Sequence, residues 1–342
     1  MEYHIFHLSH TDLDGYGCQY ITKHYFENIK FYNSNYGKEI DERFFSILND
    51  IETIDAEINL ILITDLNLTL EQCKNFEEKL SDIKKPVRIL LLDHHQTGLD
   101  CSNKYSWYYL DVSRCATKIT YDFFSNIYGK SDKLDKVANM INAVDIWQSD
   151  DKDFEIGKVC LGLIANAKEL NRIMFDEENT LYMFSLIEQS IPFYDKEDAN
   201  ILLDEHIHFM KKNFFKVDKN DTLSNLVSNY NVTLLEKLKD KMSINYKGNK
   251  GLLTFNISNV SVVGNDFLTK NTEYDFFMDV TSRKTVSFRS NGKVDVSKIA
   301  SVLANGGGHP NASGGSLTNF RDSFLYDVIK RQIDELIKSK EM

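Results

Sequence analysis

Aspartate and histidine side chains gather at the ends of three apolar runs in the first third of the chain. In chain order they are His10, Asp12, Asp14, Asp65, Asp93, His94 and His95. Imidazole and carboxylate together are a common ligand set for divalent transition metals. One Asp after a strand is most often a turn or helix cap, and one His pair is more often a surface or core feature. Caps do not require His beside Asp at two of three strand ends, so we predict that these stretches form a metal site.

The spacing of the first stretch suits two neighbouring ions. In a loop wrapped around a centre, the alternate residues His10, Asp12 and Asp14 can all face inward, and Gly15 lets the chain turn sharply into a helix. Two cations about 3.5–4 Å apart need a bridging carboxylate, and Asp65 is well placed for that. Mixed imidazole and carboxylate ligands suit Mn²⁺, Zn²⁺, Fe²⁺ or Co²⁺ better than Mg²⁺ or Ca²⁺, and the absence of Cys from these positions argues mildly against Zn²⁺.

Three buried strands must position these residues. The apolar runs Tyr3–Leu8, Ile58–Ile63 and Val87–Leu92 each lead directly into one of the stretches, and apolar residues at helical spacing separate the runs. Continuous apolar strands that alternate with helices predict a parallel sheet with helices on both faces, and hence an α/β fold. Because ligands bind beyond the carboxyl ends of such strands, we expect the side chains to converge on one crevice.

The middle of the chain has a helical pattern from Ser113, a predicted N-cap, to about Ile191. One apolar stripe in this segment ends near Asp145 and consists of Leu134, Val137, Ala138, Ile141 and Val144. A further helix from about Asp195 to Phe215 is expected to be a connector. The segment therefore completes the first domain and leads away from it.

Short strands separated by Gly, Asn and Lys turns are predicted after residue 240. They are Ser243–Tyr246, Leu252–Ile257, Phe276–Val280 and Thr285–Arg289, followed by helices at Asp295–Ala304 and near the C-terminus. We predict a catalytic metal-binding domain at 1–190, a helical linker at 191–240 and a smaller α/β domain at 241–342.

A glycine-rich stretch in the last part of the chain is a candidate phosphate site. Gly306, Gly307 and Gly308 free the backbone to approach a phosphate, and we expect their successive N–H groups to form an anion nest. His309 adds a donor at the same place. Most runs of three glycines are flexible loops or helix stops, but the residues that follow, Asn311, Ser313, Gly314 and Gly315, favour a shaped site. Arg289 ends a strand just upstream, and Arg283 and Lys284 are weaker candidates.

Composition limits the partners of this chain of 342 residues. The 51 acidic residues exceed the 40 Lys and Arg, which gives a net charge of −11 and disfavours binding to long duplex DNA. Small phosphate substrates remain possible where bound metal ions supply positive charge. No apolar run approaches the ~20 residues of a membrane span, and the N-terminus lacks the features of a signal peptide. The five widely spaced cysteines are predicted to be reduced thiols in a cytoplasmic protein.

The chemistry-bearing residues also form a pattern similar to that of a known family. His10-Thr11-Asp12-Leu13-Asp14-Gly15, Asp65, Asp93-His94-His95 and Asp145 resemble, in order, the four motifs of the DHH phosphoesterase superfamily. Gly306 to Gly315 resembles the glycine-rich signature of the DHH-associated C-terminal domain. The pattern is most similar to the branch of bacterial oligoribonucleases (nano-RNases) and pAp phosphatases. The resemblance implies an N-terminal parallel-sheet DHH domain followed by a DHH-associated substrate-binding domain.

The resemblance also implies roles for these residues around two Mn²⁺ ions, with other divalent transition metals as alternatives. One ion would be held by His10, Asp12 and Asp65. The second would be held by Asp14, Asp65, His94 and Asp145, with Asp65 bridging the two. The implied catalytic residues are Asp93, which would orient a histidine, His95, which would lie beside the substrate phosphate, and His309. The implied substrate-binding residues are Arg289, Gly306, Gly307, Gly308, His309 and Asn311.

We therefore predict a Mn²⁺-dependent phosphodiesterase of exonuclease type that hydrolyses dinucleotides and short oligonucleotides to mononucleotides, with pAp (3′-phosphoadenosine 5′-phosphate) as a further substrate. A hydroxide that bridges two ions would attack in line, and the C-terminal domain would close over the metals so that only short substrates fit. Tyr105, Trp107 and Tyr108 are candidates for base stacking, although core positions are the commoner use of such residues. A homodimer is expected from family likeness alone.

Three other functions stay open at this point. A pyrophosphatase or polyphosphatase would share the N-terminal motifs, but the glycine-rich C-terminal segment counts against it. A cyclic-nucleotide phosphodiesterase would use the same metal chemistry. A non-catalytic nucleotide sensor belongs to another class, and the presence of every expected ligand position argues against it.

Overall fold

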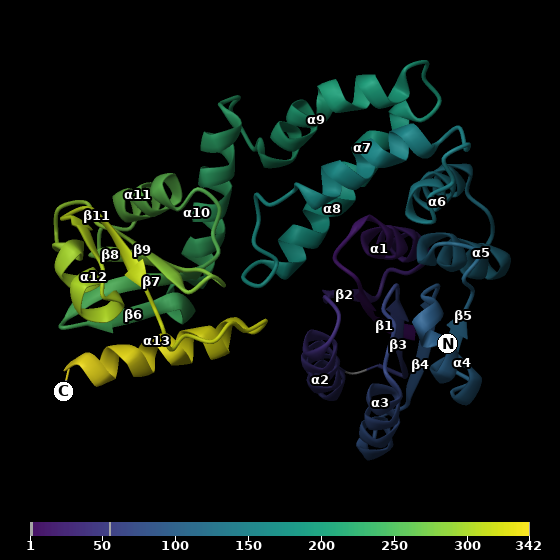
Figure 1. Ribbon diagram of the computed structural model, residues 1–342, viewed down its shortest axis with the longest axis horizontal. Helices are drawn as coiled ribbons and strands as arrows, with labels where there is room; N and C mark the ends of the chain where they lie inside the picture. The colour runs from purple at the N-terminus through teal and green to yellow at the C-terminus, as the bar shows by residue number, and fades with distance from the viewer. Residues whose placement is uncertain (1–2, 55, 342) are drawn as a thin grey trace. The chain divides into compact units, whose positions relative to one another are not determined.

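The computed structural model describes residues 3–54 and 56–341 and divides the chain into two compact units. The first comprises Met1–Ala167 and Thr180–Met210, and the second comprises Lys168–Asn179 and Lys211–Met342. The chain passes between the units after Ala167, again within α8 (Asp176–Ser190) and again within α9 (Ala199–Phe215) (Figure 1). The predicted linker at 191–240 stays a prediction.

A parallel sheet of five strands forms the centre of the first unit, in the order β2-β1-β3-β4-β5. Its strands are β1 (Tyr3–Ser9), β2 (Ile29–Asn33), β3 (Ile58–Thr64), β4 (Val87–Asp93) and β5 (Tyr108–Leu110). Helices α1 (Leu13–Tyr25), α2 (Lys38–Thr53), α3 (Leu70–Asp82) and α4 (Leu99–Lys104) follow the strands. The predicted α/β fold is therefore confirmed, and the three predicted strands end within one residue of their expected positions.

Apolar side chains of the central strands alternate between two cores, one on each face of the sheet. Phe6 and Ile61 pack in the core formed with α2, α3 and α4, whereas their neighbours Ile5 and Leu62 pack against α5 (Ala116–Tyr128). Burial on both faces explains why these strands are apolar at consecutive positions. The central strands are thereby fixed in register, and with them the loops at their carboxyl ends.

Helix α6 (Asp132–Asp145) buries the predicted apolar stripe and ends at Asp145, with α7 (Phe154–Ala165) following. The predicted N-cap Ser113 is wrong, because the N–H and the hydroxyl of Ser113 donate to Asp111 instead. Helix α5 is capped by the Sγ atom of Cys115, which accepts from the N–H of Lys118 at 3.4 Å. A thiol is an uncommon cap, so the sequence pattern favoured the serine two residues earlier.

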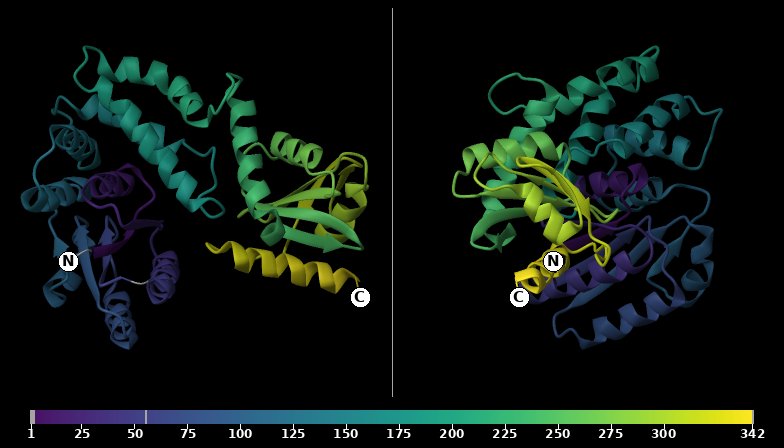
Figure 2. Two further views of the ribbon diagram at one scale, coloured as in Figure 1. Left: turned by 180° about the vertical axis from the view of Figure 1, so that it is seen from behind. Right: turned by 60° about the vertical axis from the view of Figure 1, so that its left-hand side comes forward.

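A six-stranded mixed sheet forms the centre of the second unit, in the order β10-β11-β9-β8-β7-β6. Its strands are β6 (Ser243–Tyr246), β7 (Asn249–Phe255), β8 (Phe276–Val280), β9 (Thr285–Arg289), β10 (Gly307–His309) and β11 (Ala312–Ser316). Its helices are α10 (Leu223–Met242), α11 (Val260–Lys270), α12 (Val296–Ala304) and α13 (Tyr326–Glu341). Helices α11 and α13 lie on opposite sides of this sheet (Figures 1 and 2).

Most of the elements predicted for the second unit are present. The bounds predicted for β6, β8 and β9 are correct, and α12 begins one residue later than predicted because Asp295 is its N-cap. The prediction missed α11, which crosses over between the parallel strands β7 and β8, and it missed the hairpin of β10 and β11. No helix in the described ranges combines the length and the apolar character that a bilayer crossing requires.

A buried histidine links three elements of the first unit beneath the strand ends. The ring of His7 in β1 is fully buried, and its nitrogens lie 2.8 Å from the hydroxyls of Thr22 in α1 and Thr64 in β3. Burial lowers the pKa of His7 from 6.5 to about 3, so the folded protein holds it neutral.

This histidine predicts how the first unit responds to acid. Between about pH 3 and 6.5 the unfolded chain binds the proton and the folded chain does not, so stability falls as the pH decreases through this window, by up to about 1.4 kcal/mol per pH unit. We expect His7→Gln to remove this part of the slope when the free energy of unfolding is measured in urea at several pH values. His24→Gln, at an exposed position, is the control. Equal slopes in the wild type and His7→Gln would contradict the assignment.

Candidate active site

The loops that carry the predicted ligands all follow the carboxyl ends of strands in the first sheet. Strands β1, β3 and β4 are neighbours in the sheet, run parallel, and end at Ser9, Thr64 and Asp93. The hydroxyl of Ser9 lies 2.7 Å from that of Thr64 and also donates to the carbonyl of Gly15. This contact ties the first loop to the second, so the two loops hold their side chains in a fixed relation.

His94 lies at the centre of three carboxylates. Its Nε2 atom is 3.6 Å from Oδ2 of Asp14, 3.5 Å from Oδ1 of Asp65 and 3.5 Å from Oδ2 of Asp145. These separations are long for hydrogen bonds. They are close to the about 3.0–3.4 Å that separates two ligand atoms bound at about 2.1 Å to one ion in octahedral or tetrahedral geometry. Each of the three carboxylate oxygens thus lies about as far from Nε2 as one ligand atom lies from another around a single cation.

His10 faces the other side of Asp65. Its Nδ1 atom lies 2.8 Å from Oδ2 of Asp12 and 3.7 Å from Oδ2 of Asp65. Asp65 therefore presents one oxygen to the group around His10 and the other to the group around His94. A carboxylate between two donor sets in this way is the arrangement that two neighbouring cations need.

The electrostatics of Asp65 fit a bound cation. Its Oδ2 atom is buried and accepts no hydrogen bond from the described residues. Burial, followed by repulsion from Asp14 and Asp12, raises the pKa of Asp65 well above its ordinary value. Burial and the same two neighbours raise the pKa of Asp145 from 3.8 to about 8. A divalent cation would reverse both effects, because it stabilises the charged form of each carboxylate.

The other two carboxylates of the cluster are compensated by the protein itself. Asp12 caps α1 by accepting from the N–H of Gly15 at 3.0 Å. Burial alone would raise the pKa of Asp12, but the hydrogen bond and charge of His10 and the bond from Gly15 lower it to about 2. Asp14 accepts from the N–H groups of Ala116 at 2.8 Å and Thr117 at 2.7 Å, at the N-terminus of α5. Asp14 therefore also anchors a helix, a role that the sequence did not reveal.

Asp93 holds His95 in one orientation. The carboxylate of Asp93 is fully buried, and its oxygens lie 2.7 Å from Nδ1 of His95 and 2.7 Å from the hydroxyl of Tyr108. Burial would lower the pKa of His95, but the hydrogen bond and charge of Asp93 raise it above the ordinary value. Tyr108 and Tyr105 are buried, which leaves neither of them available to stack on a base.

Sequence reasoning missed two residues at this site. The hydroxyl of Tyr36, after β2, lies 3.0 Å from Nε2 of His95, and its ring centroid is 4.6 Å from that of His10. Cys115 lies with Asp14 and Asp145 in a group whose donor atoms are all within 4.8 Å of one another. A thiol therefore lies beside the predicted ligand positions, none of which is itself a cysteine. Recognising β2 as a strand would have pointed to Tyr36, since its carboxyl end lies at the same sheet edge.

The glycine-rich stretch of the second unit forms a tight hairpin rather than the predicted nest. Residues 307–309 of β10 pair with residues 312–314 of β11. Strand β10 is the outermost strand of the sheet, so alternate N–H groups along it point away from β11. Gly308 has a φ of +146°, and a Cβ atom on Gly315 would lie 2.4 Å from the carbonyl oxygen of Ala304. The structure explains these two glycines by packing. A Cβ on Gly307, in contrast, would meet no atom within 4 Å among the described residues.

The other predicted substrate residues of this unit lie at or beside the hairpin. His309 and Asn311 are exposed. Arg289 ends β9, which pairs with β11, and its guanidinium donates to the hydroxyl of Ser261 at 2.7 Å and to the carbonyl of Phe288 at 2.8 Å. These bonds fix the direction of the guanidinium and leave other N–H groups of its five available.

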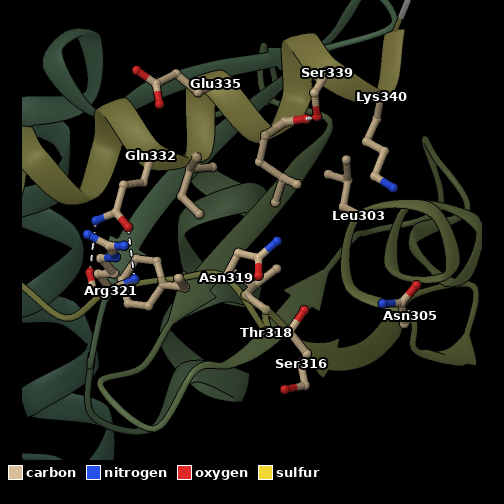
Figure 3. A pocket seen from close by; sticks show the side chains of 14 residues that line it. Leu303, Asn305, Ser316, Thr318, Asn319, Arg321, Gln332, Glu335, Ser339 and Lys340 are labelled. Carbon is tan, nitrogen blue, oxygen red and sulfur yellow. Dashed lines mark hydrogen bonds between the residues drawn. The ribbon is translucent and has the colours of Figure 1, made fainter.

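A cavity of about 610 Å³ lies between the end of α12, the loop after β11 and α13. Asn305 and Ser316, which flank the glycine-rich stretch, line it together with Arg321 and Gln332 (Figure 3). The side chain of Gln332 is bound to the backbone of Arg321 by two hydrogen bonds of 2.8 Å. None of the predicted substrate residues is among the described residues that line this cavity, so it is separate from the candidate phosphate site.

The chain is similar to a known domain family and to known proteins. The DHHA1 domain family matches residues 261–339. The chain is similar to the 3′,5′-cyclic-nucleotide phosphodiesterase of Helicobacter pylori (strain ATCC 700392 / 26695), with 40% identity over 98% of this chain and 99% of that protein. It is also similar to oligoribonuclease NrnB of Bacillus subtilis (strain 168), with 24% identity over 93% of this chain and 73% of that protein. The crystal structure of an uncharacterized protein from Helicobacter pylori G27 matches with a TM-score of 0.94 and 40% identity, over 99% of this chain and 100% of that one.

Asp65 offers a direct test of the cation argument. Asp65→Asn removes a buried like charge, and Asn tolerates the φ of +54° at this position. In a chelator we expect the variant to unfold at a higher temperature than the wild type. At a Mn²⁺ concentration of about 100 times Kd, bound metal should raise the Tm of the wild type by about 5–10 °C and have little effect on the variant.

Asp100→Asn, at an exposed position in α4, is the matched control and should respond to Mn²⁺ as the wild type does. An equal Mn²⁺-dependent rise in Tm for Asp65→Asn and the wild type would show that Asp65 is not a ligand. Differential scanning calorimetry of the full chain gives these values.

Proposed function

Because this chain belongs to the DHH phosphoesterase superfamily, we propose that it hydrolyses the phosphodiester bond of small nucleotides with the help of divalent metal ions, Mn²⁺ first among them. As a member of the superfamily it is a phosphoesterase. Our proposal concerns which substrate it hydrolyses and which metal ions it uses. The observation that carries this proposal is the position of Asp65, whose two oxygens face two separate sets of donors.

The donor atoms define two sets that would hold the ions. His10, Asp12 and Asp65 would hold one, and Asp14, Asp65, His94 and Asp145 would hold the other. Bound there, divalent ions would supply Lewis acidity, which lowers the pKa of water and offsets the negative charge that builds up on the phosphoryl oxygens. The mixed donor set supports Mn²⁺ over Mg²⁺. Cys115 beside Asp14 keeps softer ions such as Zn²⁺ open as substitutes.

His95 is proposed to transfer the proton that the leaving oxygen needs. Its Nδ1 is held by Asp93, which assigns the exchangeable position to Nε2. Tyr36 lies at hydrogen-bond distance from Nε2 and occupies the direction in which a substrate oxygen would approach. Asp93 acts here as a positioning residue, because Tyr108 and His95 bind both of its oxygens.

The hairpin of the second unit is proposed to bind a phosphate of the substrate. Support comes from Gly307, whose lack of a side chain is not required by packing, and from the exposed donors His309 and Asn311 beside it. An outward N–H of the edge strand and the fixed guanidinium of Arg289 add further donors for an anion. Gly306 and Gly308 would then serve mainly to shape the hairpin.

Two substrate classes have specific support. The name of the Helicobacter pylori relative, a 3′,5′-cyclic-nucleotide phosphodiesterase, favours cyclic mononucleotides, which would be opened by water to nucleoside monophosphates. The name of the Bacillus subtilis relative, an oligoribonuclease, favours the short oligonucleotides predicted from the sequence. We place cyclic nucleotides first, because the identity to that relative is higher and extends over nearly all of both chains.

Gly307 tests the role of the hairpin. Gly307→Ala meets no steric obstacle, so its Tm should stay within about 2 °C of the wild type. The added methyl group would lie in the path of an approaching phosphate. It should weaken binding of AMP at least about fivefold, which corresponds to the loss of one hydrogen bond. Gly315→Ala should lower the Tm instead. Gly162→Ala, which is equally unobstructed and lies in α7, is the control. Unchanged AMP affinity in Gly307→Ala, by calorimetry, would remove the hairpin from the binding site.

Turnover tests the proposed reaction itself. With Mn²⁺ we expect the wild type to convert 3′,5′-cyclic AMP to a nucleoside monophosphate, more slowly to cleave a dinucleotide, and to leave pyrophosphate nearly intact. Asp145→Asn should lower kcat by at least about 100-fold, whereas Asp150→Asn, an exposed position just beyond α6, should not. Faster turnover of pyrophosphate than of either nucleotide would contradict the proposal. AMP that binds tightly while no substrate is converted would favour a nucleotide sensor.

A further inference from the structure

Helix α6 ends in a Schellman motif in which a tryptophan occupies the usual position of glycine. The N–H of Trp147 donates to the carbonyl of Val144 at 3.3 Å, and the N–H of Gln148 donates to that of Ala143 at 2.8 Å. These are the two hydrogen bonds of the motif, and the residue between helix and loop has a left-handed backbone. Trp147 accordingly has a φ of +58°. A bulky side chain is rare in this conformation, which glycine adopts without strain.

Packing does not explain the indole of Trp147. The residue is 64% exposed, although a large aromatic side chain normally gains its stability by burial. One ring contact is present among the described residues, a perpendicular one with Phe154 at 5.1 Å between centroids. A glycine would end the helix equally well. Helix termination therefore explains neither the strained backbone nor the exposed aromatic ring at this position.

The position of Trp147 beside the carboxylate cluster supplies a reason. Asp145, two residues earlier, is the last residue of α6, and its Oδ2 lies 3.5 Å from His94. The Cα atoms of residues 145 and 147 are at most about 7.6 Å apart. A carboxylate is itself unfavourable at a helix C-terminus, where the helix dipole is negative. Two residues that local preferences disfavour therefore stand at one helix end, Asp145 with its carboxylate at the ligand cluster and Trp147 two positions further along the chain.

We propose that Trp147 is the stacking platform for the nucleobase of the substrate, with the phosphate bound at the carboxylate cluster. This inference deepens the proposed function and rests on it. In a nucleotide, one ribose separates the phosphate from the base. This separation is comparable to the short distance along the backbone between Asp145 and Trp147. The perpendicular contact with Phe154 supports the indole from one side. Stacking is tolerant of base identity, and Trp147 therefore selects for the presence of a base.

The other tryptophan of the chain provides a matched control. Trp107 is partly buried against the core beneath α3, and its Nε1 donates to Glu77 at 3.0 Å. Its ring also packs against that of Tyr105 at 5.4 Å. Trp107 is thus a structural residue, and Trp107→Phe keeps Trp147 as the sole fluorophore of its kind.

The experiment compares AMP with ribose 5-phosphate, which lacks only the base, as ligands of the Mn²⁺-loaded full chain. The wild type and Trp107→Phe should bind AMP about 5- to 100-fold more tightly than ribose 5-phosphate, and AMP alone should quench their fluorescence. Trp147→Gly should bind the two ligands within about threefold of each other. Its Tm should equal or exceed that of the wild type, since glycine relieves the backbone strain.

Two results would overturn the inference. One is an AMP preference in Trp147→Gly as large as that of the wild type. The other is a marked loss of Tm in Trp147→Gly, which would make the indole a structural anchor for Phe154. The proposed function is judged separately, by turnover of 3′,5′-cyclic AMP with Mn²⁺. Wild-type turnover combined with equal affinity for AMP and ribose 5-phosphate would reject the stacking role and leave the phosphodiesterase intact.

Discussion

Repulsion among four carboxylates at one sheet edge is the constraint around which the first unit is built. Asp12 and Asp14 are compensated by the protein, the former by His10 and the backbone of α1 and the latter by two N–H groups of α5. Asp65 and Asp145 have no comparable compensation, and burial and their neighbours raise the pKa of both. Both of these carboxylates face His94, as Asp14 also does. Cations are the ligands that this arrangement favours, and phosphate chemistry follows from them.

The site is also where local conformational preferences give way. Asp65 and Trp147 both have a positive φ, at +54° and +58°, and Asp145 places a negative charge at the negative end of a helix. Strain of this kind persists where surrounding structure fixes it, here through the strand register beneath Asp65 and the Schellman bonds around Trp147. The strands and helices below the site are held together firmly, because His7 joins β1, α1 and β3. Rigid strand ends hold the side chains of a few strained residues in fixed orientations.

Much of this arrangement could be predicted from the sequence, because the central strands are apolar on both faces and end at polar residues. The three strands, the helix that leads to Asp145 and the α/β class follow from that pattern. Tyr36 did not, because β2 is a short edge strand whose apolar pattern is weak. Cys115 was missed because a thiol is an unusual cap, and it comes close to Asp14 only in the folded chain. The glycine-rich stretch was predicted to be a nest, yet glycine runs also permit the close backbone contacts of a hairpin, and the sequence alone does not separate the two. The roles of the individual site residues stay predictions.

Anomalous diffraction from crystals grown with Mn²⁺ would locate the bound ions. We expect two peaks about 3.5–4 Å apart, both within coordination distance of Asp65, with His10 and Asp12 around one and Asp14, His94 and Asp145 around the other. A single peak, or peaks that do not share Asp65, would contradict this expectation.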